Sequence, residues 1–287
     1  MKRLFALLGL LLFLLAGCGS QQPSSQIAAT TLPVYEFTVR LCSGTDLTVT
    51  RLINENVSCL HDYSLSVNQV KAAESAELIV LSGGGLEDFM EDLLAGRHTL
   101  DASGGIPLLE SCGHDHNEDH DHHFDPHLWL SPDFAKAMCR NICEGLTSQY
   151  PAYGAVFTAN LQVLLADLDK LQAYGQAQLS SLSCRELITF HDGFSYFAEA
   201  FDLTVLKAVE EESGSEASAA LLKELILLVR AQELPAIFTE TNGSTSAAGV
   251  IAAETGAKVY TLDMAMSGDS WFKAMYRNID TVKEALK

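Results

Sequence analysis

The chain has 287 residues, and its 37 Asp and Glu outnumber its 18 Lys and Arg, which gives a formal net charge of −19 at pH 7. Such an excess of acid argues against a protein that binds nucleic acid or an anionic membrane surface. With 48% apolar and 19% charged residues, the chain is neither a disordered tail nor a fibrous repeat, and we expect an acidic globular protein of two lobes.

Residues 1–17 have the pattern of an export signal, because Lys2 and Arg3 precede an apolar run that is too short to be a comfortable membrane span. The segment from Leu15 to Cys18 resembles a bacterial lipobox, in which Cys18 is lipidated and becomes the first residue after cleavage. The alternative is an ordinary signal peptide with a chance cysteine. Residues 18–26 have the composition of a flexible tether, so we expect a lipid-anchored domain outside the cytoplasmic membrane.

From residue 27 to residue 150, short β-rich runs alternate with amphipathic segments, which is typical of βα units around a parallel sheet. The expected strands cover residues 28–31, 47–53, 78–81 and 99–102, and the expected helices cover residues 33–41, 67–75, 86–94 and 132–149. These elements predict an N-terminal α/β lobe.

Residues 151–182 predict a long connecting helix. From residue 152 onward this stretch lacks proline, contains only two glycines and carries leucines along one stripe. At a rise of 1.5 Å per residue, one continuous helix would be roughly 45 Å long, which favours a rigid strut between two lobes. The alternative is a pair of ordinary helices that break near Gly175.

Residues 183–287 repeat the pattern of the first half and predict a C-terminal α/β lobe. The expected strands cover residues 186–190, 203–208, 236–239 and 258–262, and the expected helices cover residues 193–201, 216–232, 244–255 and 270–286. The predicted fold class is therefore α/β, with two parallel-sheet lobes joined by a single long helix.

Six cysteines follow the tether, and an exported protein permits them to form disulfides. They are Cys42, Cys59, Cys112, Cys139, Cys143 and Cys184. Six cysteines allow 15 complete pairings, among which the sequence does not choose. Cys139 and Cys143 would share one helix face as a metal pair or as core residues, and the lack of a second pair at zinc-finger spacing favours core packing.

Residues 113–124 form a histidine-rich, acidic segment that contains His114, His116, His120, His122 and His123. Because it has almost nothing apolar to bury, we expect a surface loop. Its imidazoles and carboxylates suit weak, labile binding of Zn²⁺. The alternative is a solvated acidic loop without a site.

Three isolated histidines and one aspartate stand out, and two of these four side chains lie where α/β folds place function. His191 and Asp263 directly follow expected strands, and ligands of open α/β sheets bind outside the carboxyl ends of strands. His61 lies eight residues beyond an expected strand, and His127 lies just before the helix expected at 132–149. Taken singly, each histidine is better explained as a buried residue held by a hydrogen bond.

Three segments give the chain a family resemblance over essentially its whole mature length. Asp125 to Pro132 (Asp-Pro-His-Leu-Trp-Leu-Ser-Pro) resembles the characteristic motif of the substrate-binding lipoproteins of metal-importing ABC transporters. Thr189 to Phe197 is similar to a second motif, in which the zinc branch usually has His and the manganese branch Glu. Residues 238–240, 252–259 and 262–263 resemble the C-terminal section of the family, and a histidine-rich loop also recurs in zinc receptors.

The resemblance implies two similar lobes joined by one helix, with a Zn²⁺ site in the cleft between them. The implied ligands are His61, His127, His191 and Asp263. Three imidazoles and one carboxylate suit tetrahedral Zn²⁺. Its partners would be a cognate ABC permease and an ATPase, and we expect a monomer on the outer face of the cell membrane or in the periplasm.

Two other acids bear on the ligand set. Glu240, at the end of its strand, is a rival fourth ligand or an acceptor for an imidazole N–H. His61 departs from the family pattern, which commonly shows Pro-His followed by an acid and a proline. Here the run is Leu60-His61-Asp62-Tyr63, so it stays open whether Asp62 supports a ligand by a hydrogen bond or is itself a rival ligand.

Three alternatives to a zinc receptor remain. The first is a manganese or iron receptor of the same family, against which His191 argues. The second is a zinc-dependent hydrolase or hydratase, against which four protein ligands argue, since a catalytic zinc keeps one position open. The third is a surface adhesin on the same scaffold, which would need a host ligand that binds without metal.

Overall fold

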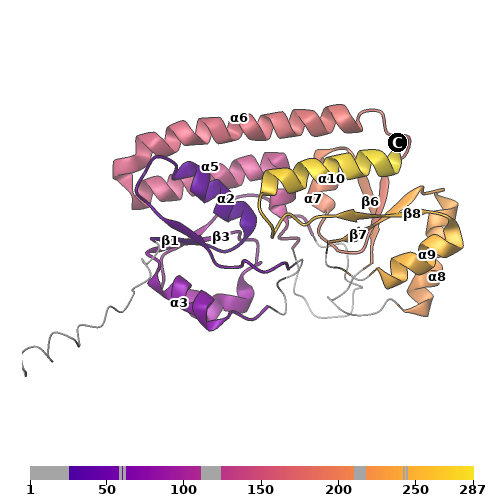
Figure 1. The fold of residues 1–287 in the computed structure, drawn as a ribbon, viewed down its shortest axis with the longest axis horizontal. Helices are drawn as coiled ribbons and strands as arrows, with labels where there is room; N and C mark the ends of the chain where they lie inside the picture. The colour runs from indigo at the N-terminus through magenta and orange to yellow at the C-terminus, as the bar shows by residue number, and fades with distance from the viewer. Residues whose placement is uncertain are drawn as a thin grey trace, which may run out of the picture.

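The computed structural model describes residues 26–57, 60, 63–110, 124–209, 218–241, 243 and 245–287. They form two α/β lobes that one long helix, α6, spans along one side of the molecule (Figure 1). The predicted fold class is thereby confirmed. Within these ranges, no helix is long and apolar enough to cross a membrane.

The N-terminal lobe contains a four-stranded parallel sheet in the order β2-β1-β3-β4. Its strands are β1 (Ile27–Ala29), β2 (Val49–Arg51), β3 (Leu78–Leu81) and β4 (Thr99–Asp101). Its helices are α2 (Leu32–Leu41), α3 (Val67–Ser75), α4 (Glu91–Leu94) and α5 (Pro132–Gln149), with short 3₁₀ turns η1 (Asp88–Met90) and η2 (Leu128–Leu130). The almost fully buried apolar run of β3 is typical of a central parallel strand that helices cover on both faces.

Local sequence signals set the ends of these helices. Proline occupies the first turn of both α2 and α5, where a missing N–H costs nothing. Ser66 and Gln69 form a capping box at the start of α3, and Ser131 caps α5 by accepting a hydrogen bond from the Phe134 N–H. The α5 cap comes directly after η2, so it fixes where that turn and the residue before it enter the interior.

The C-terminal lobe repeats the arrangement with a parallel sheet in the order β6-β5-β7-β8. Its strands are β5 (Glu186–Thr189), β6 (Thr204–Ala208), β7 (Ala236–Glu240) and β8 (Lys258–Leu262). Its helices are α7 (Ser195–Ala200), α8 (Ala219–Ala231), α9 (Ser246–Thr255) and α10 (Trp271–Leu286). Both β7 and β5 are central strands, so their carboxyl ends lie side by side.

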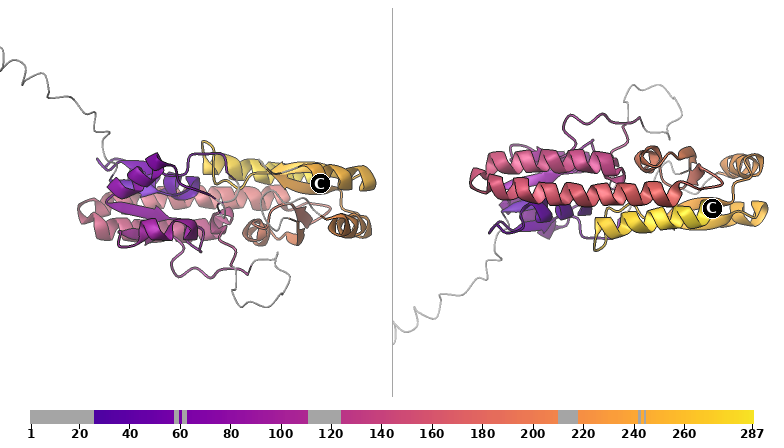
Figure 2. Two further views of the ribbon diagram at one scale, coloured as in Figure 1. Left: turned by 90° about the horizontal axis from the view of Figure 1, so that it is seen from below. Right: turned by 90° about the horizontal axis from the view of Figure 1, so that it is seen from above.

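Helix α6 (Gly154–Leu179) follows the short 3₁₀ turn η3 (Pro151–Tyr153) and runs unbroken through Gly175, so the alternative of two helices broken there is wrong. It packs along α2 and α5 of the first lobe and along α10 of the second (Figure 2). A Cβ at Gly175 would lie 2.2 Å from a ring carbon of Phe201. This glycine therefore permits close packing against the C-terminal lobe and does not end the helix.

The helix expected over residues 86–94 is also wrong, because η1 and the one-turn α4 replace it. Gly83, Gly84 and Gly85 all have positive φ, and the buried Glu87 carboxylate accepts hydrogen bonds from the Ser82 and Gly83 N–H groups. These contacts hold the chain in successive turns, so no continuous helix forms there.

A single hydrophobic core runs from one lobe into the other. Apolar side chains of both sheets, of α6 and of α10 belong to the same buried cluster, while a smaller cluster lies beneath α8 and α9. Hydrogen bonds also cross between the lobes, from Arg51 Nη1 to the Gly268 carbonyl at 2.8 Å and from the Trp271 N–H to Glu36 Oε2 at 2.6 Å. The lobes are thus fixed relative to one another on either side of the site described next.

Candidate metal centre

His127 lies in the interior directly before η2, and an aspartate two residues earlier holds its ring. Asp125 Oδ1 accepts hydrogen bonds from the His127 backbone N–H at 2.9 Å and from its Nδ1 at 2.7 Å. The first of these bonds is an Asx turn, which an Asp-Pro sequence favours. Because Nδ1 carries the hydrogen of that bond, Nε2 of His127 is left as the nitrogen that can bind a cation.

His191 reaches the same place from the other lobe, two residues beyond the end of β5. The Thr189 hydroxyl donates to its carbonyl at 3.0 Å. Its Nδ1 lies 3.4 Å from Oε2 of Glu240, the last residue of β7. A carboxylate next to Nδ1 favours a hydrogen on that atom and leaves Nε2 as the nitrogen that can bind a cation.

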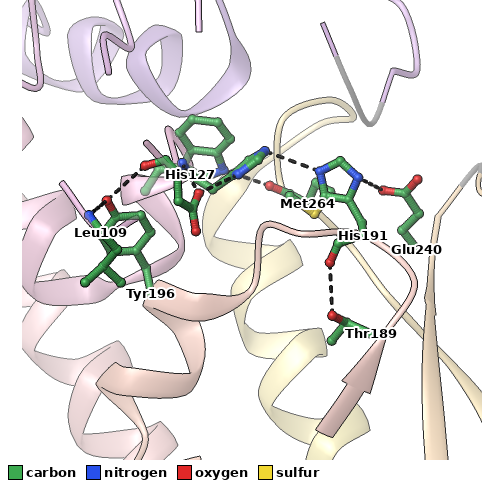
Figure 3. A network of polar contacts seen from close by, with 9 residues as sticks. Leu109, His127, Thr189, His191, Tyr196, Glu240 and Met264 are labelled. Carbon is green, nitrogen blue, oxygen red and sulfur yellow. Dashed lines mark hydrogen bonds and ion pairs between the residues drawn. The ribbon is translucent and has the colours of Figure 1, made fainter. Parts of the chain in front are cut away.

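The two imidazoles meet at the interface between the lobes. Their Nε2 atoms are 3.4 Å apart, and the rings stand at 82° with centroids 5.2 Å apart (Figure 3). His127 and His191 are 4% and 8% exposed. Both Nδ1 atoms are directed to carboxylates and the two Nε2 atoms are in hydrogen-bond contact with each other, so both Nε2 atoms are turned toward one point, where a cation could bind them.

The acidic side chains beside the two imidazoles also favour a cation at this place. Asp125 and Glu240 are both buried, so two acidic side chains lie in the interior beside the two imidazoles. Buried charge without a counter-ion is costly. Asp125 Oδ2 is buried and has no hydrogen-bond partner among the residues that the structure describes. A divalent cation would balance this charge.

Asp263, the expected fourth ligand, directly follows β8 but directs its carboxylate elsewhere. Oδ1 accepts a hydrogen bond from the Ala265 N–H at 2.8 Å, and Oδ2 lies 3.0 Å from Arg277 Nη2 on α10. Its side chain is 22% exposed. Across the described ranges, no group of three or more His, Cys, Asp or Glu side chains is arranged to hold a metal ion. The structure therefore brings together His127 and His191 and leaves Asp263 in an ion pair.

The residues next to Asp263 nevertheless form part of the wall of the site. The Trp129 indole N–H donates to the Met264 carbonyl at 2.8 Å and so joins the two lobes. A Cβ on Gly193 would lie 2.6 Å from Met264 Cε and 2.8 Å from His127 Nδ1. Only glycine at position 193 lets these two side chains approach the turn after β5.

Several of the predicted residues lie outside the described ranges. They are His61, Asp62, the five loop histidines from His114 to His123, and Cys18 with the signal and tether. Their roles stay predictions. The same holds for Cys59 and Cys112.

The four cysteines that the structure describes are free thiols. Cys139 and Cys143 are both buried on the core side of α5, where burial raises the pKa of each thiol. This placement confirms the preference for core packing over a metal pair.

Sequence reasoning did not single out Asp125 as the partner of His127. The signal was present, since an acid two residues before a histidine and directly before proline can accept from that histidine's backbone N–H and side chain together. For Glu240 the role of N–H acceptor was one of two alternatives, and the structure places its carboxylate at Nδ1 of His191 and not at Nε2.

A family model described as "Zinc-uptake complex component A periplasmic" matches residues 27–285. The chain is 30% identical to "Zinc-binding lipoprotein AdcA" of Streptococcus pneumoniae, over 99% of this chain and 61% of that protein. The chain thus spans less than two thirds of the length of this curated relative.

Solved structures share the fold over nearly the same range. A crystal structure of ZnuA is 30% identical with a TM-score of 0.80 and covers 92% of this chain and 100% of its own. A ZnuA deletion mutant with zinc bound is 29% identical with a TM-score of 0.78, over 92% of this chain and 98% of its own. FpvC of Pseudomonas aeruginosa in complex with Mn²⁺ is 26% identical with a TM-score of 0.77, over 91% and 97%.

Proposed function

The chain belongs to the family of the zinc-uptake complex component A, and on that premise we propose that it is an extracytoplasmic receptor that binds Zn²⁺ and delivers it to an ABC-type metal importer. The observation that carries this proposal is the convergence of two imidazoles from opposite lobes, with their Nε2 atoms 3.4 Å apart. Imidazole nitrogen is a preferred ligand of Zn²⁺, and a carboxylate on the other ring nitrogen is its usual second partner.

The proposed ligands are His61, His127, His191 and Asp263. For Asp263 to bind metal, its carboxylate must leave Arg277, which is 70% exposed and so gives up little on returning to water. Glu240 is proposed as the acceptor that orients His191. With two acidic side chains already buried beside the imidazoles, the site favours a divalent cation over a neutral ligand.

Zinc is favoured over manganese because the convergent donors are nitrogens. Mn²⁺ prefers sites rich in hard oxygen ligands and tolerates imidazole less well as a majority donor. A structural relative with Mn²⁺ bound makes this the first rival to test. The zinc-enzyme alternative finds no support in a family described as an uptake component.

For the parts of the chain outside the described ranges, the proposal follows the sequence. Cys18 would carry the lipid that anchors the receptor, with the domain on the outer face of the cell membrane or in the periplasm. The loop histidines would add weaker, exchangeable metal binding. A cognate permease with its ATPase would take the ion from the interlobe site.

Metal stoichiometry and competition test the proposal. The soluble protein starting at Gly19 and a matched variant without residues 113–123 are titrated with Zn²⁺, alone and with a large excess of Mn²⁺. We expect one tightly bound Zn²⁺ in both proteins, resistant to Mn²⁺, and further weak equivalents only when the loop is present. Displacement by Mn²⁺ would reassign the metal, and loss of tight binding in the loop deletion would move the site to the loop.

A further inference from the structure

A tyrosine of the C-terminal lobe makes two hydrogen bonds to the backbone of the N-terminal lobe next to the metal centre. Tyr196 lies in α7, and its hydroxyl donates to the Asp125 carbonyl at 2.9 Å and accepts from the Leu109 N–H at 2.8 Å. The side chain is fully buried. Desolvation by burial raises the pKa of Tyr196 to about 12, so the hydroxyl stays protonated and can donate and accept at once.

Asp125 connects this tyrosine to the first imidazole. Its backbone N–H donates to the Leu109 carbonyl at 2.8 Å, so residues 109 and 125 are tied to each other as well as to the tyrosine hydroxyl. Its Oδ1 accepts from both the backbone N–H and Nδ1 of His127. The route from hydroxyl to imidazole thus passes through one residue (Figure 3).

The position of Tyr196 in the sequence shows that this route connects the two ligand-bearing segments. The residue follows His191 by five positions in the same lobe, whereas Asp125 precedes His127 by two positions in the other. The hydroxyl therefore fixes one ligand-bearing segment against the other. The ring cannot easily swing away, because Phe134 packs edge-on against it with centroids 5.3 Å apart.

We propose that Tyr196 is a positioning residue that sets the separation of the His127 and His191 imidazoles, and thereby the affinity for the metal and the rate of its release. The inference rests on the proposed function, since it concerns the same site. Removing the hydroxyl takes one hydrogen-bond partner from the Asp125 carbonyl and one from the Leu109 N–H. Asp125 then loses its anchor to the other lobe, and the imidazole that it orients moves with it.

The test compares Tyr196→Phe with Tyr174→Phe. Tyr174 on α6 is a half-buried tyrosine outside the site, and its hydroxyl donates to Asp280 on α10 at 2.6 Å. Each variant is titrated with Zn²⁺ against a chromophoric chelator, and the release rate is followed after excess chelator is added. We expect about tenfold weaker binding and faster release for Tyr196→Phe, the lower end of the effect of losing a group that orients a metal ligand, and less than about a twofold change for Tyr174→Phe.

Two further readouts separate positioning from a loss of stability. The visible spectrum of bound Co²⁺ reports ligand geometry and should change in Tyr196→Phe, while far-UV circular dichroism should not. In an Asp125→Ala background, Tyr196→Phe should lose most of its effect on affinity, because the route to His127 is already broken. An equal loss in both backgrounds would overturn the inference.

The outcomes also separate the inference from the function on which it rests. If the unmodified protein binds Zn²⁺ tightly and Tyr196→Phe binds it with the same affinity, release rate and Co²⁺ spectrum, the positioning role is wrong and the receptor function stands. If the unmodified protein does not bind Zn²⁺ tightly, the proposed function itself fails.

Discussion

The Nε2 atoms of His127 and His191 lie 3.4 Å apart, although the two residues are 64 positions apart in the chain and belong to different lobes. Each ring has a carboxylate at its Nδ1 atom, from Asp125 and Glu240 respectively. The carboxylates favour the same tautomer in both rings, and the two Nε2 atoms are turned toward the same point between the lobes. A site of this kind has its ligands oriented before the ion arrives, which lowers the ordering cost of binding.

The contact between Glu240 and His191 predicts that Glu240→Ala weakens zinc binding about 10- to 100-fold, as removal of a carboxylate that orients a ligating histidine commonly does. Glu254→Ala is the matched control, because Glu254 is an exposed glutamate on α9 that pairs with Arg230. Chelator competition with both variants gives the affinities. Equal affinities for the two variants would contradict an orienting role for Glu240.

The close approach at Gly193 predicts that Gly193→Ala also impairs the site. The added methyl would lie 2.8 Å from His127 Nδ1, whose hydrogen bond to Asp125 it must disturb. We expect zinc affinity to fall by about tenfold or more, because loss of the partner that orients a ligating histidine typically costs about 10- to 100-fold. Gly249→Ala is the control, since a Cβ there meets nothing within 4 Å. A Gly193→Ala protein with unchanged affinity would show that His127 is not packed as described.

Gly175→Ala tests the packing of the connecting helix. Alanine favours a helix over glycine, yet the methyl would meet the Phe201 ring at 2.2 Å. Overpacking of this kind costs about 1 to 3 kcal/mol, more than the roughly 1 kcal/mol that helix propensity returns. Chemical denaturation should therefore show Gly175→Ala to be less stable than the parent protein and Gly249→Ala to be equally or more stable. The reverse order would mean that α6 does not pack on Phe201.

The buried Glu87 carboxyl predicts a pH dependence of stability. Desolvation by burial raises its pKa from an ordinary 4.5 to about 7, against the lowering effect of hydrogen bonds from the Thr30 hydroxyl and from the Ser82 and Gly83 N–H groups. Because the pKa is higher in the folded state, the contribution to stability is full below about pH 4.5 and is lost as the pH rises through 7. Between pH 5 and pH 8 this one group should remove about 2 to 3 kcal/mol from the free energy of unfolding.

Glu87→Gln isolates that contribution, because the amide does not titrate. Denaturant unfolding of the metal-free protein at pH 5 and at pH 8 gives the difference for each protein. The parent protein should lose about 2 to 3 kcal/mol more than Glu87→Gln over this interval. If the two proteins lose the same amount, Glu87 does not hold its proton in the folded state.

Most of the fold could be predicted from the spacing of apolar residues. The ends of β3, α3, α5 and β8 agree with the expected ranges, because caps, prolines or buried apolar runs mark them. The helix expected at residues 86–94 was wrong because the buried Glu87 carboxylate holds the chain in turns. The periodicity of apolar residues does not reveal such a contact. For a similar reason, the sequence left open whether the long helix continues through Gly175 or breaks there. The reason for a glycine within this helix is its packing against the Phe201 ring, which local sequence does not show.

The candidate site could be predicted less completely. Residue type and the carboxyl ends of strands indicated His191, Glu240 and Asp263, and the family resemblance added the rest. Which nitrogen faces the ion, and which acid holds each ring, depends on distances between lobes that sequence spacing does not fix. The hydrogen bond from Tyr196 to Asp125 across the interface also depends on such a distance.

The most direct test of the central claim is the zinc affinity of His127→Ala and His191→Ala measured beside His98→Ala, which removes an exposed histidine directly before β4. We predict that both site variants lose more than about 100-fold in affinity, beyond what a second-shell change costs, and that His98→Ala binds zinc like the parent protein. Tight zinc binding that survives in His191→Ala would contradict a metal centre shared by the two lobes.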